Sequence, residues 1–185
     1  MNGEDERRPA AVTLGIIDEP PHGVIFIERA THLRSHAGQI GLPGGGMDEI
    51  DGNDLEKTAL REMEEEVGVA AERVSFVGRL PLVRARVNRY VVTPFVAIIR
   101  SGELRIDATE TVGVFTVPLS SVVEELTQGI VTVGTLEIET PLLEYDGRRI
   151  WGLTGHILRS FVDSWEDSNN ELRRRIEAML YAERR

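Results

Sequence analysis

The stretch that decides the fold runs from residue 58 to residue 69 and reads Thr58-Ala59-Leu60-Arg61-Glu62-Met63-Glu64-Glu65-Glu66-Val67-Gly68-Val69. At about 100° per residue, a helix separates these side chains into an apolar side and an acidic side. The apolar side holds Leu60, Met63 and Val67, and roughly opposite it lie Glu62, Glu65 and Glu66. Because Gly68 supplies the expected stop, the pattern predicts a helix over residues 54–67.

Three carboxylates on one side of a helix have two interpretations: a solvated charged face, which is by far the commonest, or a metal site. Like charges four residues apart destabilise a helix by about a few tenths of a kcal/mol. The stretch has no lysine four residues on that would pair with the glutamates. A divalent cation such as Mg²⁺ prefers oxygen ligands and would remove the repulsion. On spacing alone, the two interpretations are equally supported.

A run of glycines upstream favours the metal interpretation. The segment Leu42-Pro43-Gly44-Gly45-Gly46 leads toward the acidic helix. Glycines allow backbone N–H groups to approach an anion closely, although this segment alone would also suit an ordinary turn. Taken together, the glycines and the carboxylates predict the two halves of a metal–diphosphate site.

The composition is that of a globular protein. The chain has 185 residues, enough for one domain, with 41% hydrophobic and 28% charged residues. No stretch approaches the roughly 18–20 consecutive apolar residues of a membrane-spanning helix. The polar, acidic N-terminus is unlike a signal peptide, and the lack of cysteine excludes disulfides and thiolate sites. We therefore expect a cytoplasmic protein.

The net charge restricts the partners. Thirty-one acidic residues against 21 lysines and arginines give a net charge of −10. Such a surface does not attract nucleic acid or an anionic membrane, so neither is expected as a partner. A phosphate-bearing substrate would need local cations, either a metal ion, an arginine cluster or both.

Outside the acidic helix, the patterns predict one α/β domain with a mixed sheet and a helix on each side. Strands are expected over residues 11–17, 23–27, 74–80, 90–99, 130–138 and 150–153. Further helices are expected over residues 119–126, 155–165 and 171–181. Ser120 or Ser121 would cap the first of these, and the last carries an apolar stripe of Leu172, Ile176, Met179 and Leu180. Residues 29–46 are expected to form a long loop, and residues 1–10 a flexible tail.

The glycines and the acidic helix together resemble the Nudix box of Nudix hydrolases. Gly44-Gly45 followed by residues 61–69 matches every fixed position of the helical half of that box. The upstream half departs, because Asn53 stands where the family has a glutamate eight residues before the arginine, and two extra residues separate it from the glycines. Asp51 or Asp54 could substitute. The resemblance implies an α/β/α sandwich with a mixed sheet, formed by a single Nudix domain over residues 11–185.

A second motif resembles coenzyme A pyrophosphatases within that family. It consists of Arg29-Ala30, Arg34 and Gly38 at intervals before Leu42-Pro43-Gly44-Gly45. The acidic loop with Asp48 and Asp51 is also similar, as are residues 114–119 and 150–154. The likeness therefore spans roughly residues 12–162.

The resemblance implies roles for individual residues. The metal ligands for Mg²⁺ or Mn²⁺ would be Glu62, Glu65 and Glu66. Arg61 would orient these carboxylates, and the general base would be Glu65 or Glu110. Substrate would contact Arg29, Arg34, Gly44 and Gly45, with His36 as a further neighbour.

The expected reaction is hydrolysis of coenzyme A or its thioesters to 3′,5′-ADP and a phosphopantetheine product. A Nudix pyrophosphatase for another nucleoside diphosphate derivative, such as NADH, ADP-ribose or a nucleotide sugar, is the alternative. A nucleotide-sensing module without catalysis is a third reading, but all three glutamates are present and favour an enzyme. The sequence is also compatible with a homodimer.

Overall fold

The computed structural model describes residues 7–30, 38–85, 89–106, 111–167 and 169–181. In the described part of the chain, none of the helices has the length and apolar character needed to cross a membrane.

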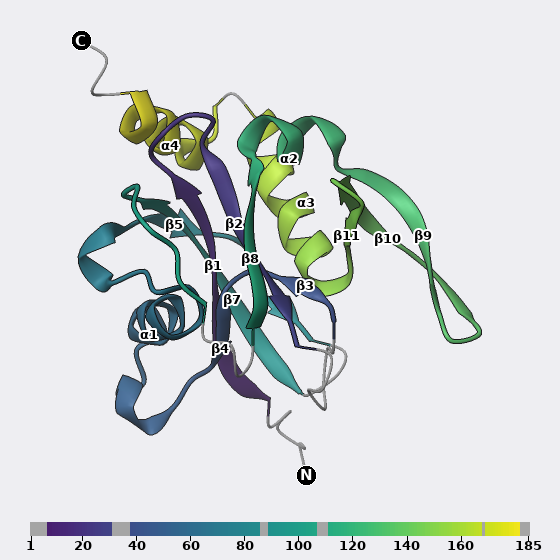
Figure 1. Ribbon diagram of the computed structural model, residues 1–185, viewed down its shortest axis with the longest axis horizontal. Coiled ribbons are helices and arrows are strands. Elements are labelled where there is room, and N and C mark those ends of the chain that lie inside the picture. Colours follow the sequence, from purple (N-terminus) through teal and green to yellow (C-terminus); the bar gives the residue numbers. More distant parts are fainter. Residues whose placement is uncertain (1–6, 31–37, 86–88, 107–110, 168, 182–185) are drawn as a thin grey trace.

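A mixed sheet forms the centre of the molecule (Figure 1). Its main path runs β3–β2–β1–β7–β5, formed by Ile40–Gly41, Gly23–Arg29, Arg8–Ile17, Tyr90–Ile99 and Val74–Arg79. Three further strands join it: β4 (Gly44–Gly46) pairs with β1, β6 (Val83–Arg84) with β7, and β8 (Thr111–Pro118) with β2. Only β1 and β7 are parallel among the described pairs, with Arg8 opposite Tyr90 and Ile17 opposite Ile99.

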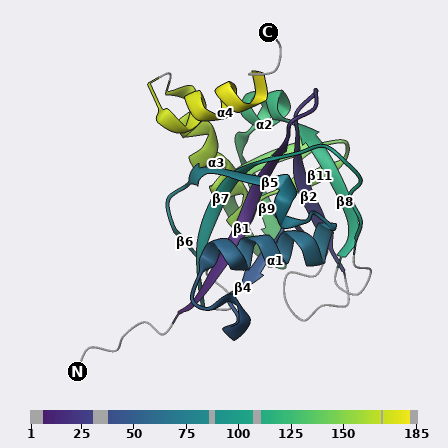
Figure 2. The ribbon, with the colours of Figure 1, turned by 90° about the vertical axis from the view of Figure 1, so that its left-hand side faces the viewer.

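Helices cover both faces of this sheet, as Figure 2 shows from the side. Helix α1 (Leu55–Val67) lies on one face, and α2 (Leu119–Glu125), α3 (Gly152–Glu166) and α4 (Glu171–Tyr181) lie on the other. Two short 3-10 helices, η1 (Glu49–Asp51) and η2 (Ala71–Arg73), flank α1 in the chain. The predicted α/β/α arrangement with a mixed sheet is confirmed.

The two faces of β1 explain why its sequence is apolar almost throughout. Leu14 and Ile16 belong to the core beneath α3, whereas Ala11 packs with Ala59 of α1 and Phe95 of β7. A strand that is buried on both faces loses the apolar–polar alternation of a half-exposed strand. The same holds for β7, where the prediction of residues 90–99 is confirmed to the residue.

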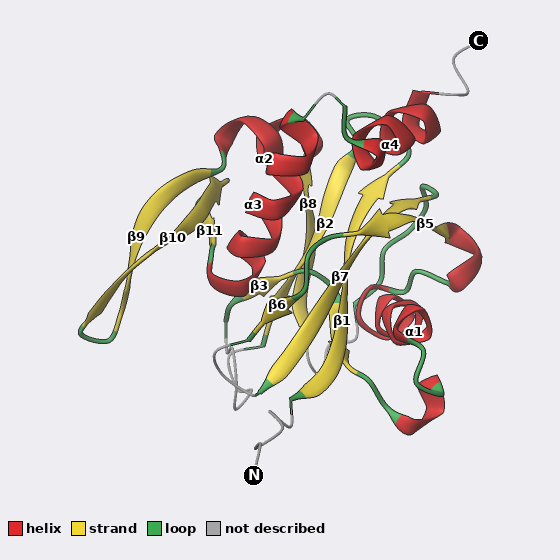
Figure 3. Cartoon of the chain, turned by 180° about the vertical axis from the view of Figure 1, so that it is seen from behind, coloured by secondary structure: helices red, strands yellow, loops and turns green. Residues whose placement is uncertain are grey.

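A separate three-stranded sheet projects from the body (Figure 3). It consists of β9 (Thr127–Val133), β10 (Leu136–Tyr145) and β11 (Arg148–Ile150). The expected single strand over residues 130–138 is therefore wrong, because Gly134, with a φ of 62°, turns the chain between β9 and β10. The expected strand over residues 150–153 ends at Ile150, and α3 begins at Gly152.

Other boundaries also differ from the expectations. The segment 29–46 contains β3 and β4, so it is only partly a loop. The N-cap of α2 is Pro118, whose restricted φ suits a helix start, and neither Ser120 nor Ser121 takes that place. Strand β1 begins at Arg8, inside the expected tail. In α4, Ile176 and Leu180 are buried, but Met179 is exposed and lies off the packed stripe.

Candidate active site

Helix α1 positions the acidic side chains against the sheet. Asp54 caps its N-terminus by accepting a hydrogen bond from the Glu56 N–H at 2.9 Å. Gly68 ends it in the left-handed conformation, with a φ of 67°, as the sequence predicts. Between these caps, Ala59 and Met63 are buried against the sheet.

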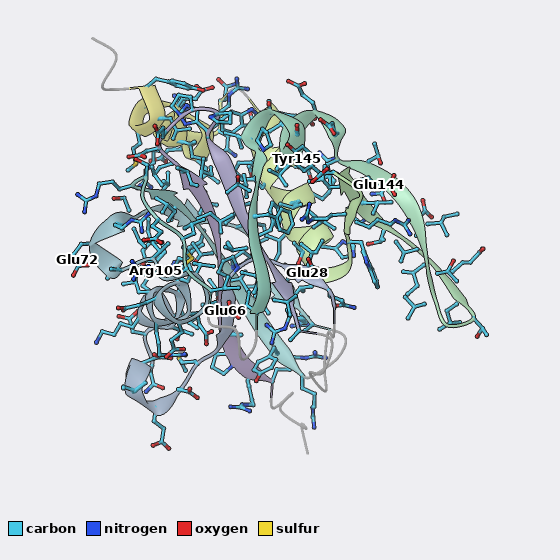
Figure 4. All side chains as sticks on the ribbon, viewed as in Figure 1. Glu28, Glu66, Glu72, Arg105, Glu144 and Tyr145 are labelled. Atoms are coloured by element: carbon cyan, nitrogen blue, oxygen red, sulfur yellow. The ribbon has the colours of Figure 1, made fainter. Side chains whose placement is uncertain are left out.

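The three predicted metal ligands do not share one environment. Glu66 is 7% exposed in its side chain and Glu62 is 14% exposed, whereas Glu65 is 59% exposed. The expectation that all three lie opposite the apolar side is therefore wrong for Glu66, which lies between α1 and the sheet (Figure 4). It follows Met63 by three residues, and residues three apart are neighbours on a helix surface.

The glycine strand β4 receives the two inward carboxylates. The Gly44 N–H donates a hydrogen bond to Glu66 Oε2 at 2.8 Å. At Gly45, a Cβ atom would overlap the Glu62 carboxylate, so only glycine allows Glu62 to lie there. Gly44 itself has a φ of 152° and passes close to the backbone of Val12. Both glycines therefore support the acids of α1, and their contact with substrate stays a prediction.

Arg61 holds a group of acids together. Its Nη1 donates to Glu62 Oε1 at 2.8 Å and to Glu65 Oε2 at 2.9 Å. Its Nη2 donates to the Gly46 carbonyl at 3.0 Å and to Asp51 Oδ2 at 3.1 Å. Its Nε donates to Asp51 Oδ1 at 3.0 Å. These contacts occupy all five N–H groups of the guanidinium. Arg61 thus contacts two of the carboxylates that the resemblance expects it to orient, and that role in the reaction stays a prediction.

Asp51 is the buried partner of Arg61. It is 2% exposed, and its Oδ2 also accepts hydrogen bonds from the Asp48 N–H and the Thr58 hydroxyl, each at 2.9 Å. The hydrogen bond from Arg61 lowers the pKa of Asp51 to about 2, with burial opposing the shift and the other two donors supporting it. In turn, the hydrogen bond to Asp51 raises the pKa of Arg61 above its usual value. Asp51 and Arg61 are therefore both charged throughout the physiological pH range.

Arg29 ends β2 beside Glu66. Its Nη1 lies 3.5 Å from Glu66 Oε1. The pairing of β2 with β8 shifts register between Glu28 and Arg29. Its Nε is buried and has no hydrogen-bond partner in the described structure. Arg29 is thus the second arginine that lies among the acids of α1. The other predicted residues of the loop and the predicted base, Arg34, His36 and Glu110, lie outside the described residues.

In the described part of the chain, the acids of α1 have different partners and do not form one cluster. Glu62 and Glu65 share Arg61, whereas Glu66 faces Gly44 and Arg29. Within the described ranges, no three acidic or histidine side chains are grouped so that they could hold a metal ion together. The expected convergence of three carboxylates is therefore not what the structure shows.

Two contacts of the site had no counterpart in the sequence analysis. The helical pattern gives Thr58 no role beyond the helix, but its hydroxyl donates a hydrogen bond to Asp51. The Gly46 carbonyl accepts from Arg61, which ties the glycine strand to the helix. The hydrogen bond from the Asp48 N–H to Asp51 does have a local signal, because these two acids have the three-residue spacing of a capping box.

Comparison with known proteins identifies the family. The model of the NUDIX domain matches residues 6–131, more than half of the chain. The chain belongs to the Nudix family. Proteins from Salmonella paratyphi B and Salmonella newport, both described as the uncharacterized Nudix hydrolase NudL, are 34% identical over 164 residues, which covers 84% of this chain and 82% of theirs. This Nudix protein is accordingly a hydrolase, and the reading as a sensor without catalysis is set aside.

Solved structures share the Nudix fold. An Ap4A hydrolase from C. elegans superposes with a TM-score of 0.55 at 14% identity, covering 84% of this chain and 96% of that one. The Nudix hydrolase RenU from M. smegmatis gives a TM-score of 0.52 at 21% identity, covering 63% and 73%. At these identities the likeness concerns the fold alone.

Proposed function

We propose that this Nudix hydrolase cleaves the diphosphate of coenzyme A or its thioesters to 3′,5′-ADP and a phosphopantetheine product. The observation that carries the proposal is the position of Arg29, the first residue of the motif that resembles coenzyme A pyrophosphatases. Arg29 lies beside Glu66 and has a buried Nε without a partner in the described structure. A guanidinium with an unused donor suits the phosphate oxygens of an anionic substrate.

The residues present suit a divalent metal ion, which Nudix hydrolases generally use. Glu62 and Glu66 supply carboxylate oxygens, the ligands that Mg²⁺ and Mn²⁺ prefer, and both lie against the glycine strand. Glu65 is the third proposed ligand and hydrogen-bonds to the same Arg61 nitrogen as Glu62. A bound divalent ion would supply charge neutralisation at the diphosphate and activation of water.

The protein's own contribution is positioning. Arg61 holds the carboxylates of Glu62 and Glu65 in a fixed orientation, and the Gly44 N–H does the same for Glu66. Fixed groups of this kind need no rearrangement during the reaction, which is the main way in which a protein assists phosphoryl chemistry. The proton acceptor for the attacking water is Glu65 or Glu110, and replacement of each by glutamine decides between them.

A substrate screen tests the proposal. Coenzyme A, dephospho-coenzyme A, NADH, ADP-ribose and a nucleotide sugar are each incubated with the protein, with Mg²⁺ and with Mn²⁺, and the products are separated by chromatography. We expect the highest kcat/KM for coenzyme A or a thioester, with 3′,5′-ADP as one product. A higher kcat/KM for any substrate that lacks the 3′-phosphate would favour the alternative, a pyrophosphatase for another nucleoside diphosphate derivative.

A further inference from the structure

The acid that the Nudix box places eight residues before its arginine is absent from this chain. Asn53 stands there, exposed and in the left-handed conformation with a φ of 62°. Gly52 before it has the same conformation, so the two residues turn the chain from η1 into the start of α1. Asparagine tolerates this conformation well, so Asn53 suits the turn.

We infer that Asp51 is the positioning residue that orients Arg61, and through Arg61 the carboxylates of Glu62 and Glu65. Both oxygens of Asp51 accept from Arg61, at 3.0 and 3.1 Å, in a bidentate pair. A bidentate pair fixes the plane of the guanidinium as well as its distance. With that plane fixed, Nη1 on the far side points to Glu62 and Glu65.

The surroundings of Asp51 show that the contact is built into the fold. Thr58 of α1 and the Asp48 N–H each donate to Oδ2, so the carboxylate is held from the helix and from the loop. The lengthened loop therefore delivers an acid to Arg61 from ten residues upstream, two earlier than the family's position. Asp54, the other acid expected to substitute for the family's glutamate, accepts a hydrogen bond from the Glu56 N–H and serves as the cap of α1.

The inference rests on the proposed metal site, and its test separates the two. The variants are Asp51→Asn, which keeps the shape but removes the charge, and Asp54→Asn, a matched control that can still cap α1. Three quantities are measured: the Arg61 Nε–H signal by NMR, the affinity for Mn²⁺ alone by calorimetry, and kcat/KM for the best substrate of the screen. Asp51→Glu, which restores a carboxylate, is measured as the conservative variant.

We expect Asp51→Asn to shift or abolish the Arg61 Nε–H signal, and to weaken Mn²⁺ binding and kcat/KM by about 10-fold to 100-fold, the usual effect of removing a residue that orients a ligand. For Asp54→Asn, both the Mn²⁺ affinity and kcat/KM should stay within about twofold of the parent protein. Asp51→Glu should recover part of what Asp51→Asn loses. In an Arg61→Ala background, Asp51→Asn should cause no further loss, because it acts through Arg61.

An unchanged Arg61 signal and Mn²⁺ affinity in folded Asp51→Asn would overturn the inference, as would an equal loss in both backgrounds. Should Asp51→Asn not fold, Arg61→Lys decides, because a single ammonium cannot bind Asp51 through two nitrogens and also reach Glu62 and Glu65. Unchanged Mn²⁺ affinity in Arg61→Lys then overturns it. A parent protein that binds no Mn²⁺ contradicts the proposed metal site, while the NMR signal still decides the role of Asp51.

Discussion

Replacement of Glu66 by glutamine is the most direct test of the proposed site. The side chain is 7% exposed, and its contacts include the Gly44 N–H at 2.8 Å and Arg29 Nη1 at 3.5 Å. Glutamine has nearly the same shape and can still accept the hydrogen bond from the Gly44 N–H, but it lacks the negative charge that would bind a metal cation. We expect kcat/KM to fall at least about 100-fold, since removal of one group that stabilises charge in the transition state commonly costs 10²–10³.

The same substitution has a predictable effect on stability. Repulsion among the three glutamates alone would favour a higher Tm for the variant. The loss of the Arg29 pair and of the charged acceptor for Gly44 acts in the opposite direction, by about 1 kcal/mol. For a protein of this length, that corresponds to a decrease in Tm of about 2–4 °C. We therefore expect Glu66→Gln to lower the Tm, because the loss of these two contacts outweighs the relief of repulsion.

The assay compares Glu66→Gln with Glu64→Gln, which removes the same charge from an exposed position of α1. Each variant is melted by circular dichroism without metal, and kcat/KM is measured with Mg²⁺. Glu64→Gln should match the parent protein in kcat/KM. Near-normal turnover by a folded Glu66→Gln would refute the assignment of Glu66 as a metal ligand.

Three further outcomes follow from the proposals. Arg34→Ala should reduce kcat/KM for coenzyme A more than for dephospho-coenzyme A; equal losses would mean that Arg34 orders the loop or serves the shared diphosphate. Because the pKa of Asp51 is about 2, its charge stabilises the folded protein fully above about pH 4, and this stabilisation is lost as the pH falls through 2. Denaturant titrations should therefore show that Asp51→Asn lowers the free energy of unfolding by about 2 kcal/mol at pH 7 and by much less at pH 2. Calorimetry with a catalytically slow variant that retains the metal ligands should show weak coenzyme A binding without Mg²⁺ and much tighter binding with it. Equal affinities in the two conditions would mean that the arginines and backbone amides, and not the metal ion, bind the substrate.

The sequence predicts well those elements that local signals define. Helix α1 starts at a capping aspartate and ends at Gly68, and both signals lie within the helix's own neighbourhood. Strand β7 is a ten-residue segment that is almost wholly apolar. The β9–β10 hairpin was missed because its apolar and β-branched residues continue on both sides of Gly134, which hides a turn of two residues.

The site shows the opposite limit, because the sequence indicates its acids and Arg61 but not the burial of Glu66 or the partner of Asp51. The burial of Glu66 depends on β4, and β4 exists because Gly44–Gly46 pairs with Ala10–Val12 of β1, more than thirty residues away in the chain. No pattern within the acidic helix carries that information. Asp51 was a candidate by its charge alone, and only the packing of the lengthened loop shows that it, and not Asp54, meets Arg61.

The charges of the site explain how an acidic protein could bind an anionic substrate. The ion pairs of Arg29 and Arg61 together involve the carboxylates of Asp48, Asp51, Glu62, Glu65 and Glu66. Five formal negative charges against two positive ones leave −3, which one divalent cation would reduce to −1. Since both arginines are already paired with these acids, most of the attraction for a diphosphate would come from a metal ion, with the Arg29 Nε–H as a further donor to phosphate. Metal and substrate should therefore raise each other's affinity by the same factor, as linkage requires.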